Sequence, residues 1–260
     1  MLRPRIIPCL LVHDKGLVKT IKFSNPKYVG DPINAVRIFN EKECDELMIL
    51  DIDATVRTLE PDLKLITMLA AECRMPLCYG GGIKTVEQAR KIISLGVEKV
   101  ALSSVAIENT SIITKIADEI GCQSVVVVID IKKYTITGKY EIYINNGKTT
   151  TGREPVEFAK EVELAGAGEI VINSIDRDGT MKGYDLDLIR QMREAISIPL
   201  TVLGGAGSLA DIESLIREHR VLGISAGSLF VFKGPYKAVL ISYPDPGEKN
   251  AMIERARRTL

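Results

Sequence analysis

The sequence predicts an α/β fold, a parallel eight-stranded (β/α)8 barrel, and three features of the chain lead to this class. Short β-branched runs alternate with amphipathic helical patterns eight times. These runs are almost continuously apolar, which is typical of strands that helices cover on both faces. The length of 260 residues suits a barrel that forms a single domain over residues 1–260. A doubly wound open sheet is the alternative that shares this alternation.

The expected elements follow one another as strand, helix, strand. The first helix is expected over DPINAVRIFNEK, where Asp31 can cap the first turn and Pro32 suits the first helical position. A later helix over TVEQARKIISLG is expected to end at Gly96. Residues 132–154 favour a β-hairpin over the rim, and residues 244–260 a final covering helix. The eight strands are expected at residues 5–12, 46–52, 76–81, 98–103, 124–130, 169–174, 199–205 and 222–227.

The two halves of the chain resemble each other, which predicts a barrel built from a duplicated half-barrel. The glycine pairs at 81–82 and 204–205 align at an offset of 123 residues, and the segments ELMILDID and EIVINSID share this offset. When the alignment is continued to the first strand of each half, Leu11 falls opposite Asp130. The second half therefore carries a carboxylate where the first half carries an aliphatic side chain.

Composition and charge exclude several classes of function. Lys plus Arg equal Asp plus Glu at 34 each, so the chain has no overall field to attract nucleic acid or an anionic membrane. The five cysteines form no CxxC pair and suit a reducing compartment, and two histidines leave few ligands for zinc. We expect neither a metal nor a cofactor. No apolar run approaches a membrane span, and the N-terminal run is too short for a secretory leader, so we expect a cytoplasmic protein.

The chemistry of a (β/α)8 barrel is found at the C-terminal ends of its strands. Here glycine-rich turns follow the third and seventh strands, and serines follow the fourth and eighth. Their backbone N–H groups can hold a phosphate at each of two opposed places, which predicts a ligand with two phosphates. Glycine turns that only reverse the chain are the alternative. The residues expected to bind phosphate or substrate are Gly82, Ser103, Ser104, Asp178, Gly179, Gly205, Gly227 and Ser228.

Two side chains at this rim are candidates for acid–base and anion chemistry. Asp130 ends an apolar strand, where partial desolvation suits a carboxylate for general acid or base catalysis. Its alternative role is a helix cap or an ion pair with Lys132 or Lys133. Lys19, in the loop expected after the first strand, can close over a bound anion. The alternative for Lys19 is a solvated loop lysine.

Four charged residues stand at the starts of strands, and therefore at the opposite end of the barrel, its floor. A barrel interior is normally filled with aliphatic side chains. Two cations and two anions at the floor can instead form a neutral, inward-facing ring, which is a candidate gate for a small polar molecule. Charges that simply point into water are the alternative. The four residues are Arg5, Glu46, Lys99 and Glu169.

Several motifs resemble those of one family, the cyclase subunit of imidazole glycerol phosphate synthase, over nearly the whole chain. They are RIIPCL, GDP before the first helix, DELMILDI, GGGIKTVEQA, VVVVID, GAGEI, SIDRDGTMKGYD and GGAGSL. The resemblance implies a (β/α)8 (TIM) barrel whose floor docks a glutaminase subunit in a heterodimer. Glu98, next to Lys99 at the floor, is an expected docking contact. It implies that ammonia passes a charged gate and travels up the interior to two catalytic aspartates. The gate positions correspond to Arg5, Glu46, Lys99 and Glu169.

The resemblance also assigns roles at the rim, and one residue does not fit. Asp130 corresponds to the second catalytic aspartate and Lys19 to the lysine of a mobile first loop. The first catalytic aspartate corresponds to Leu11, which has no proton to give or accept. Ser103 stands where the family commonly has asparagine beside one phosphate, and Leu203 stands where it has serine beside the other.

The missing carboxylate predicts a changed function. Loss of one of two acid–base groups lowers a rate by on the order of 10² to 10⁴. The pattern therefore resembles a paralogous branch, the acetamidino-modification proteins of surface-polysaccharide (O-antigen) synthesis. In that branch the barrel and its glutaminase supply ammonia to a separate amidotransferase, which acts on a nucleotide-linked or lipid-linked sugar.

Three other functions are compatible with the sequence. The first is a genuine cyclase and lyase of histidine biosynthesis in which another group replaces the missing carboxylate, with His13 and Asp14 nearby in the chain. The second is a phosphate-binding scaffold without catalysis. The third is an isomerase barrel acting on an earlier intermediate of the same pathway, against which the charged floor argues because an isomerase admits no ammonia.

Overall fold

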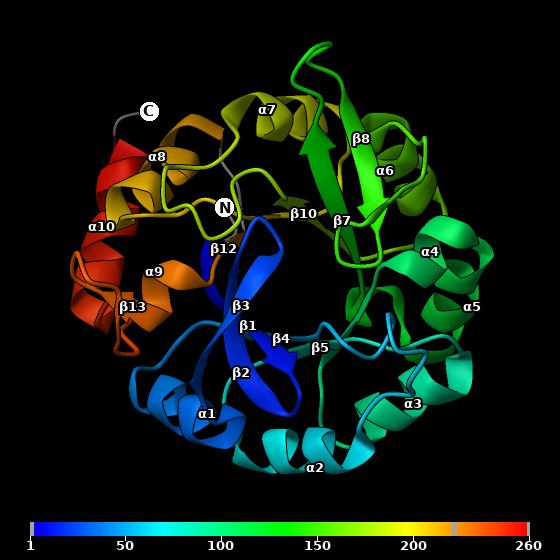
Figure 1. Cartoon of the computed structure of the whole chain (residues 1–260), viewed down its shortest axis with the longest axis horizontal. Helices are drawn as coiled ribbons and strands as arrows, with labels where there is room; N and C mark the ends of the chain where they lie inside the picture. The colour runs from blue at the N-terminus through cyan, green and yellow to red at the C-terminus, as the bar shows by residue number, and fades with distance from the viewer. Residues whose placement is uncertain (1–2, 220–222, 259–260) are drawn as a thin grey trace.

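Eight parallel strands close into a barrel with helices around it, as the view down the barrel in Figure 1 shows. The computed structural model describes residues 3–219 and 223–258. Because β10 pairs with β7 and β12 pairs with β1, the eight parallel strands close on themselves. This confirms the predicted (β/α)8 barrel and not the doubly wound open sheet. Residue 222 of the expected eighth strand lies outside the described residues. The barrel strands are β1 (Arg5–His13), β4 (Leu47–Asp51), β5 (Leu77–Gly80), β6 (Lys99–Leu102), β7 (Val125–Lys133), β10 (Glu169–Ser174), β11 (Leu200–Leu203) and β12 (Gly223–Ala226).

The helices begin where the sequence supplies caps. Asp31 accepts a hydrogen bond from Asn34 N at 2.9 Å at the start of α1, and Thr85 and Gln88 form a capping box at the start of α3. Among the described residues no helix is both long and apolar enough to cross a membrane. The helices are α1 (Pro32–Glu41), α2 (Leu63–Glu72), α3 (Val86–Ser94), α4 (Ser104–Glu108), α5 (Ser111–Ile120), α6 (Pro155–Leu164), α7 (Leu186–Ala195), α8 (Leu209–His219), α9 (Ser228–Val231) and α10 (Pro246–Arg258), with a 3₁₀ turn at Cys122–Ser124.

The first strand of each half continues into an antiparallel hairpin above the mouth of the barrel (Figure 1). In the first half, β1 turns back into β2 (Gly16–Ile21) and β3 (Ser24–Gly30). In the second half, β7 turns back into β8 (Tyr140–Ile144) and β9 (Thr149–Thr150), which confirms the hairpin predicted in residues 132–154. A short pair, β13 (Phe232–Lys233) and β14 (Ala238–Val239), lies outside the barrel.

The interior of the barrel is filled by small and medium apolar side chains, as expected for this fold. They form a cluster separate from the larger core between the strands and the surrounding helices. Leu11 and Leu50 pack on this cluster from the mouth. Its buried members are Ile7, Cys9, Met48, Cys78, Ala101, Val126, Val128, Val171 and Leu203.

Candidate active site at the barrel mouth

A cavity of about 420 Å³ opens at the C-terminal ends of the strands. The rim residues predicted from the sequence all line it, so the fold brings both predicted phosphate sets and both candidate catalytic residues to one place. The set comprises Lys19, Gly82, Ser103, Ser104, Asp130, Asp178, Gly179, Gly205, Gly227 and Ser228. Their roles as ligand contacts stay predictions.

Asp130 lies on β7 at the wall of this cavity. Its Oδ1 accepts a hydrogen bond from Asn173 Nδ2 at 3.0 Å, and burial raises the pKa of Asp130 to about 7. The alternative of an ion pair with Lys132 or Lys133 is wrong, because Lys132 stacks over Tyr143 and Lys133 pairs with Asp187 of α7. A carboxyl group that exchanges its proton near neutral pH suits general acid–base catalysis.

Lys19 is already inside the mouth. It lies on strand β2, so the expectation of a loop position is wrong, as is the solvated-lysine alternative, because only 6% of Lys19 is exposed. Its ammonium donates to the carbonyl oxygen of Cys9, and burial lowers its pKa. A Cβ on Gly227 would lie 2.5 Å from Lys19 Nζ, so the glycine leaves the room that the ammonium occupies. A buried cation beside a predicted phosphate site favours an anionic ligand there.

Leu11 faces the same cavity from the other side of the barrel. It pairs in register with Leu50 on β4, and Cys9 and Leu203 extend this apolar wall toward the interior. These four side chains carry no carboxyl group. His13 and Asp14, the residues nearby in sequence, do not line the cavity, so the structure does not support them as replacements for the missing carboxylate.

Asn173 is a cavity residue that the sequence motifs did not single out, although the duplication of the chain points to it. It stands next to Asp130 in the register of β7 and β10, and it is 6% exposed. The offset of 123 residues between the halves places Asn173 opposite Leu50, so the polar pair Asp130 and Asn173 corresponds to the apolar pair Leu11 and Leu50. Continuing the duplication one strand further would have found it.

The two predicted phosphate sets are similar in structure. Ser103 precedes α4 and Gly227 precedes α9, so the first turns of both short helices point their N–H groups at the mouth. Gly205 has φ 114°, and a Cβ on it would lie 2.2 Å from the carbonyl oxygen of Gly183, so this turn requires glycine. Lys84, near the first set, also lines the cavity and escaped the sequence analysis.

Hydrogen bonds tie each hairpin to the opposite half of the barrel. Asp178, in the turn after β10, accepts hydrogen bonds from Thr20 Oγ1 at 2.8 Å and from Phe23 N at 3.4 Å, both in the first hairpin. Asn146, between β8 and β9, donates from Nδ2 to the carbonyl oxygen of Ile52 at 2.8 Å. Asp178 therefore positions a hairpin as well as lining the cavity.

The four charges at the floor point at one another and form a ring. Arg5 pairs with Glu46 and, at 2.8 Å, with Glu169, while Lys99 reaches each glutamate at 2.9 Å. Thr201 Oγ1 also donates to Glu169. The glutamate side chains are 3% and 6% exposed, so the ring plugs the interior and does not simply project into water. Glu98, beside Lys99, is exposed at the same end.

The cavity extends into the barrel as far as the small side chains of Cys9, Ala101 and Val128. A layer of apolar side chains separates it from the charged ring. A molecule that moves from the floor to the mouth therefore has to pass between these side chains. The layer consists of Ile7, Met48, Cys78, Val126 and Val171.

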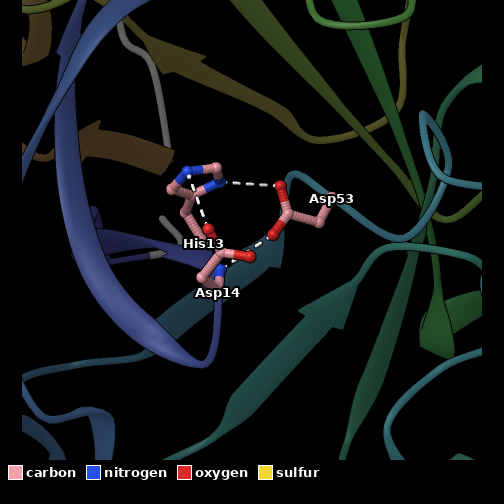
Figure 2. A group of neighbouring side chains, drawn as sticks. All are labelled: His13, Asp14 and Asp53. Atoms are coloured by element: carbon pink, nitrogen blue, oxygen red, sulfur yellow. Dashed lines mark hydrogen bonds and ion pairs between the residues drawn. The ribbon is translucent and has the colours of Figure 1, made fainter.

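His13, Asp14 and Asp53 form a polar cluster at the turn between β1 and β2, drawn in Figure 2. His13 Nδ1 lies 2.7 Å from Asp53 Oδ1, and Asp14 N donates to Asp53 Oδ2 at 2.8 Å. Arg57 pairs with both carboxylates, at 2.6 Å to Asp14 and 3.5 Å to Asp53. Because the Arg57 guanidinium already pairs with both carboxylates, the cluster acts as a brace between the hairpin and the segment after β4.

Sequence comparisons identify the family to which the chain belongs. The model of the histidine biosynthesis protein family matches residues 5–236. A Leptospira interrogans protein named "Putative imidazole glycerol phosphate synthase subunit HisF" is 58% identical over 253 residues, 97% of this chain and 100% of that protein. The Vibrio vulnificus protein named "Putative imidazole glycerol phosphate synthase subunit hisF3" is 56% identical over 98% of both chains. The "Imidazole glycerol phosphate synthase subunit HisF" of Alkaliphilus metalliredigens is 40% identical over 88% of this chain and 91% of its own. The chain therefore belongs to the histidine biosynthesis protein family and, within it, to the HisF-type cyclase subunits of imidazole glycerol phosphate synthase.

Proposed function

We propose that the chain is the barrel subunit of a glutamine-dependent amidotransferase system and conducts ammonia from a glutaminase partner. The glutaminase docks at the floor in a heterodimer, with Glu98 as one contact, and ammonia enters through the ring of four charges. One observation carries this proposal: the floor ring is complete and directed inward, whereas the mouth above it is lined by Leu11 at the position that the resemblance assigns to a catalytic aspartate. The system acts in the cytoplasm.

The properties of the interior favour uncharged ammonia over ammonium. The apolar layer offers no partner to a cation, and moving an unpaired charge into such a layer is strongly unfavourable. Each cation of the ring already contacts both glutamates, so one can swing aside while the other keeps the carboxylates paired. Arg5 and Lys99 are the more exposed members of the ring, at 27% and 16% of their side chains, and they are the candidates for this motion.

The acceptor of the ammonia in this proposal is a sugar bound to a separate amidotransferase. Leu11 supports this division of labour, because it lines the mouth at the position where the resemblance expects a catalytic aspartate, and a mouth without that carboxylate is poorly equipped for ring closure. The product is an amidine (acetamidino) group on a nucleotide-linked or lipid-linked sugar of a surface polysaccharide. The mouth retains phosphate-binding turns, and a phosphorylated or nucleotide-sugar molecule bound there would signal that an acceptor is present.

A second candidate function is the cyclase and lyase reaction of imidazole glycerol phosphate synthase in histidine biosynthesis. The observation that favours it is the mouth itself, where two phosphate-binding sets, the buried Lys19 and the near-neutral Asp130 surround one cavity. In this function Asp130 alone exchanges protons with the substrate. A third candidate, a phosphate-binding scaffold, requires no Asp130 chemistry at all.

Reconstitution with a glutaminase from the same genome tests the proposal. We expect a stable heterodimer and stimulated glutamine hydrolysis, both weakened by Glu98→Arg, while turnover of the histidine-pathway nucleotide with added ammonia stays at least about 100-fold below that of an ordinary cyclase. Absence of both docking and stimulation would overturn the proposal. Ordinary ammonia-dependent turnover would favour the cyclase. The scaffold would be favoured if Asp130→Asn left the pathway output unchanged while variants of the floor ring abolished that output.

A further inference from the structure

Asn173 carries an unused hydrogen-bonding atom beside the carboxyl group of Asp130. Its Nδ2 donates to Asp130 Oδ1 at 3.0 Å, but its Oδ1 is buried and has no partner among the described residues. A buried amide oxygen without a donor is costly, and native structures rarely keep one without a reason. The amide faces the carboxyl group of Asp130, and this group offers a reason.

Asp130 needs opposite partners in its two protonation states. As a carboxylate it only accepts hydrogen bonds, and as a carboxylic acid it also has an O–H to donate. Burial brings the pKa of Asp130 to about 7, so both states are well populated at neutral pH. The side-chain amide of Asn173 has one donor end and one acceptor end, and a half-turn about its terminal bond exchanges them.

We propose that Asn173 is a positioning residue that holds Asp130 in both protonation states: its Nδ2 donates to the carboxylate, and after a half-turn its Oδ1 accepts from the carboxylic acid. The amide neither gains nor loses a proton, and none of its covalent bonds changes. Asp130 therefore keeps one orientation toward the cavity while its proton is taken up or released. This role rests on the proposed function only in so far as Asp130 exchanges protons with a ligand.

The surroundings leave room for the half-turn. Gly204 lies beside the free oxygen, and a Cβ there would be 3.0 Å from Asn173 Oδ1. The other groups that face Asp130 do not take over the role: Asp178 is a second acid, and the buried Cys9 thiol has a pKa raised to about 11. Lys19 donates to a backbone carbonyl, and Tyr143 of β8 only pairs with Asp130 in the strand register.

The wild-type chain supplies a first test that needs no substitution. The side-chain ¹⁵N–¹H signals of Asn173 are followed in a pH titration beside the ¹³C carboxyl signal of Asp130, which is assigned with Asp130→Asn. We expect the amide signals to shift with the same midpoint as the carboxyl, at pH about 7. Amide signals that stay constant across the carboxyl titration would overturn the proposal.

Substitutions at Asn173 provide the second test. Asn173→Leu removes the donor to the carboxylate, so we expect the pKa of Asp130 to rise by about one to two units. Asn173→Thr carries a hydroxyl that both donates and accepts, and we expect it to restore the value to within about half a unit. Asn40→Leu is the matched control, because both amide atoms of Asn40 have partners outside the cavity, and it should leave Asp130 unchanged.

The outcomes separate this inference from the proposed function. An Asp130 pKa that Asn173→Leu does not move, or that Asn173→Thr does not restore, would contradict the positioning role. Glutaminase docking and stimulated glutamine hydrolysis depend on the floor, so they should be the same in all three variants. Where a ligand turns over, the pH profile should move with the carboxyl titration.

Discussion

The two halves of the barrel mouth place different chemistry on equivalent positions. In the first half Leu11 pairs with Leu50, and in the second half Asp130 pairs with Asn173. The backbone register, the glycine turns and the hairpins are alike in both halves, so the fold does not dictate the difference. The comparison teaches that a duplicated scaffold can keep its backbone geometry while one half carries two aliphatic side chains where the other carries a carboxyl group and an amide.

The largest expected effect comes from making the halves chemically alike. Leu11→Asp supplies a second carboxyl group on the cavity wall, opposite Asp130. If the mouth still binds the histidine-pathway nucleotide, we expect ammonia-dependent turnover to rise by about 10² to 10⁴. Steady-state kinetics with added ammonia measure it, with Leu50→Asp as the matched control. No gain, together with intact ligand binding, would mean that more than one group separates this mouth from a cyclase.

The next effect concerns the floor, where Glu46 and Glu169 are also equivalent by duplication. The pKa of Glu169 is lowered, with Lys99 and Arg5 stabilising its charge against burial, whereas burial raises the pKa of Glu46. We expect Glu169→Gln to reduce the free energy of unfolding by about 3 kcal/mol and Glu46→Gln by less. Denaturant unfolding measures both changes.

The pH dependence of the floor variants provides a check. A lowered carboxyl pKa contributes stability that is present above the unfolded value of 4.5 and is lost as the pH falls through the folded value. The loss caused by Glu169→Gln should therefore shrink in acid. Equal losses for the two variants at neutral pH would show that the two sides of the ring are interchangeable.

An effect of similar size distinguishes Asp130 from a permanently neutral side chain. Its folded pKa of about 7 lies above the unfolded value of 3.8, so the folded state holds a proton that the unfolded state releases between these values. Stability contributed by Asp130 should fall as the pH rises from about 4 to 7 and then level off. We expect Asp130→Asn to be relatively more stable at pH 8 than at pH 4, by on the order of 2 to 4 kcal/mol. Unfolding curves at the two pH values measure the change, and a constant difference would contradict the raised pKa.

The smallest effect tests the hairpins. Thr20→Val removes the hydroxyl that donates to Asp178 and should cost about 1 kcal/mol. Hydrogen exchange should quicken in β2 and β3 more than in β8. Asn146→Ala removes the corresponding link of the second hairpin, so its exchange should quicken in residues 140–150 instead. Uniform acceleration in both variants would show that the hairpins move as one unit.

The barrel and the membership of the rim could be predicted from the sequence, because buried parallel strands and glycine turns leave strong local patterns. The sequence predicts a loop at Lys19, whereas pairing with both β1 and β3 makes the run GLVKTI a strand. The Asp130–Asn173 hydrogen bond depends on a contact between strands 43 residues apart, which no local pattern encodes. The direction of the floor charges likewise depends on how the barrel closes.

The crossing of the hairpin links has a consequence for engineering. Thr20 is anchored by a residue of the second half, and Asn146 by a residue of the first. A chimera that joins one half of this chain to the complementary half of a relative would separate each hairpin from the residue that anchors it. Grafts should therefore transfer a hairpin together with its distant anchoring residue. Otherwise the hairpins at the entrance to the cavity will not be held in place, even though every strand is present.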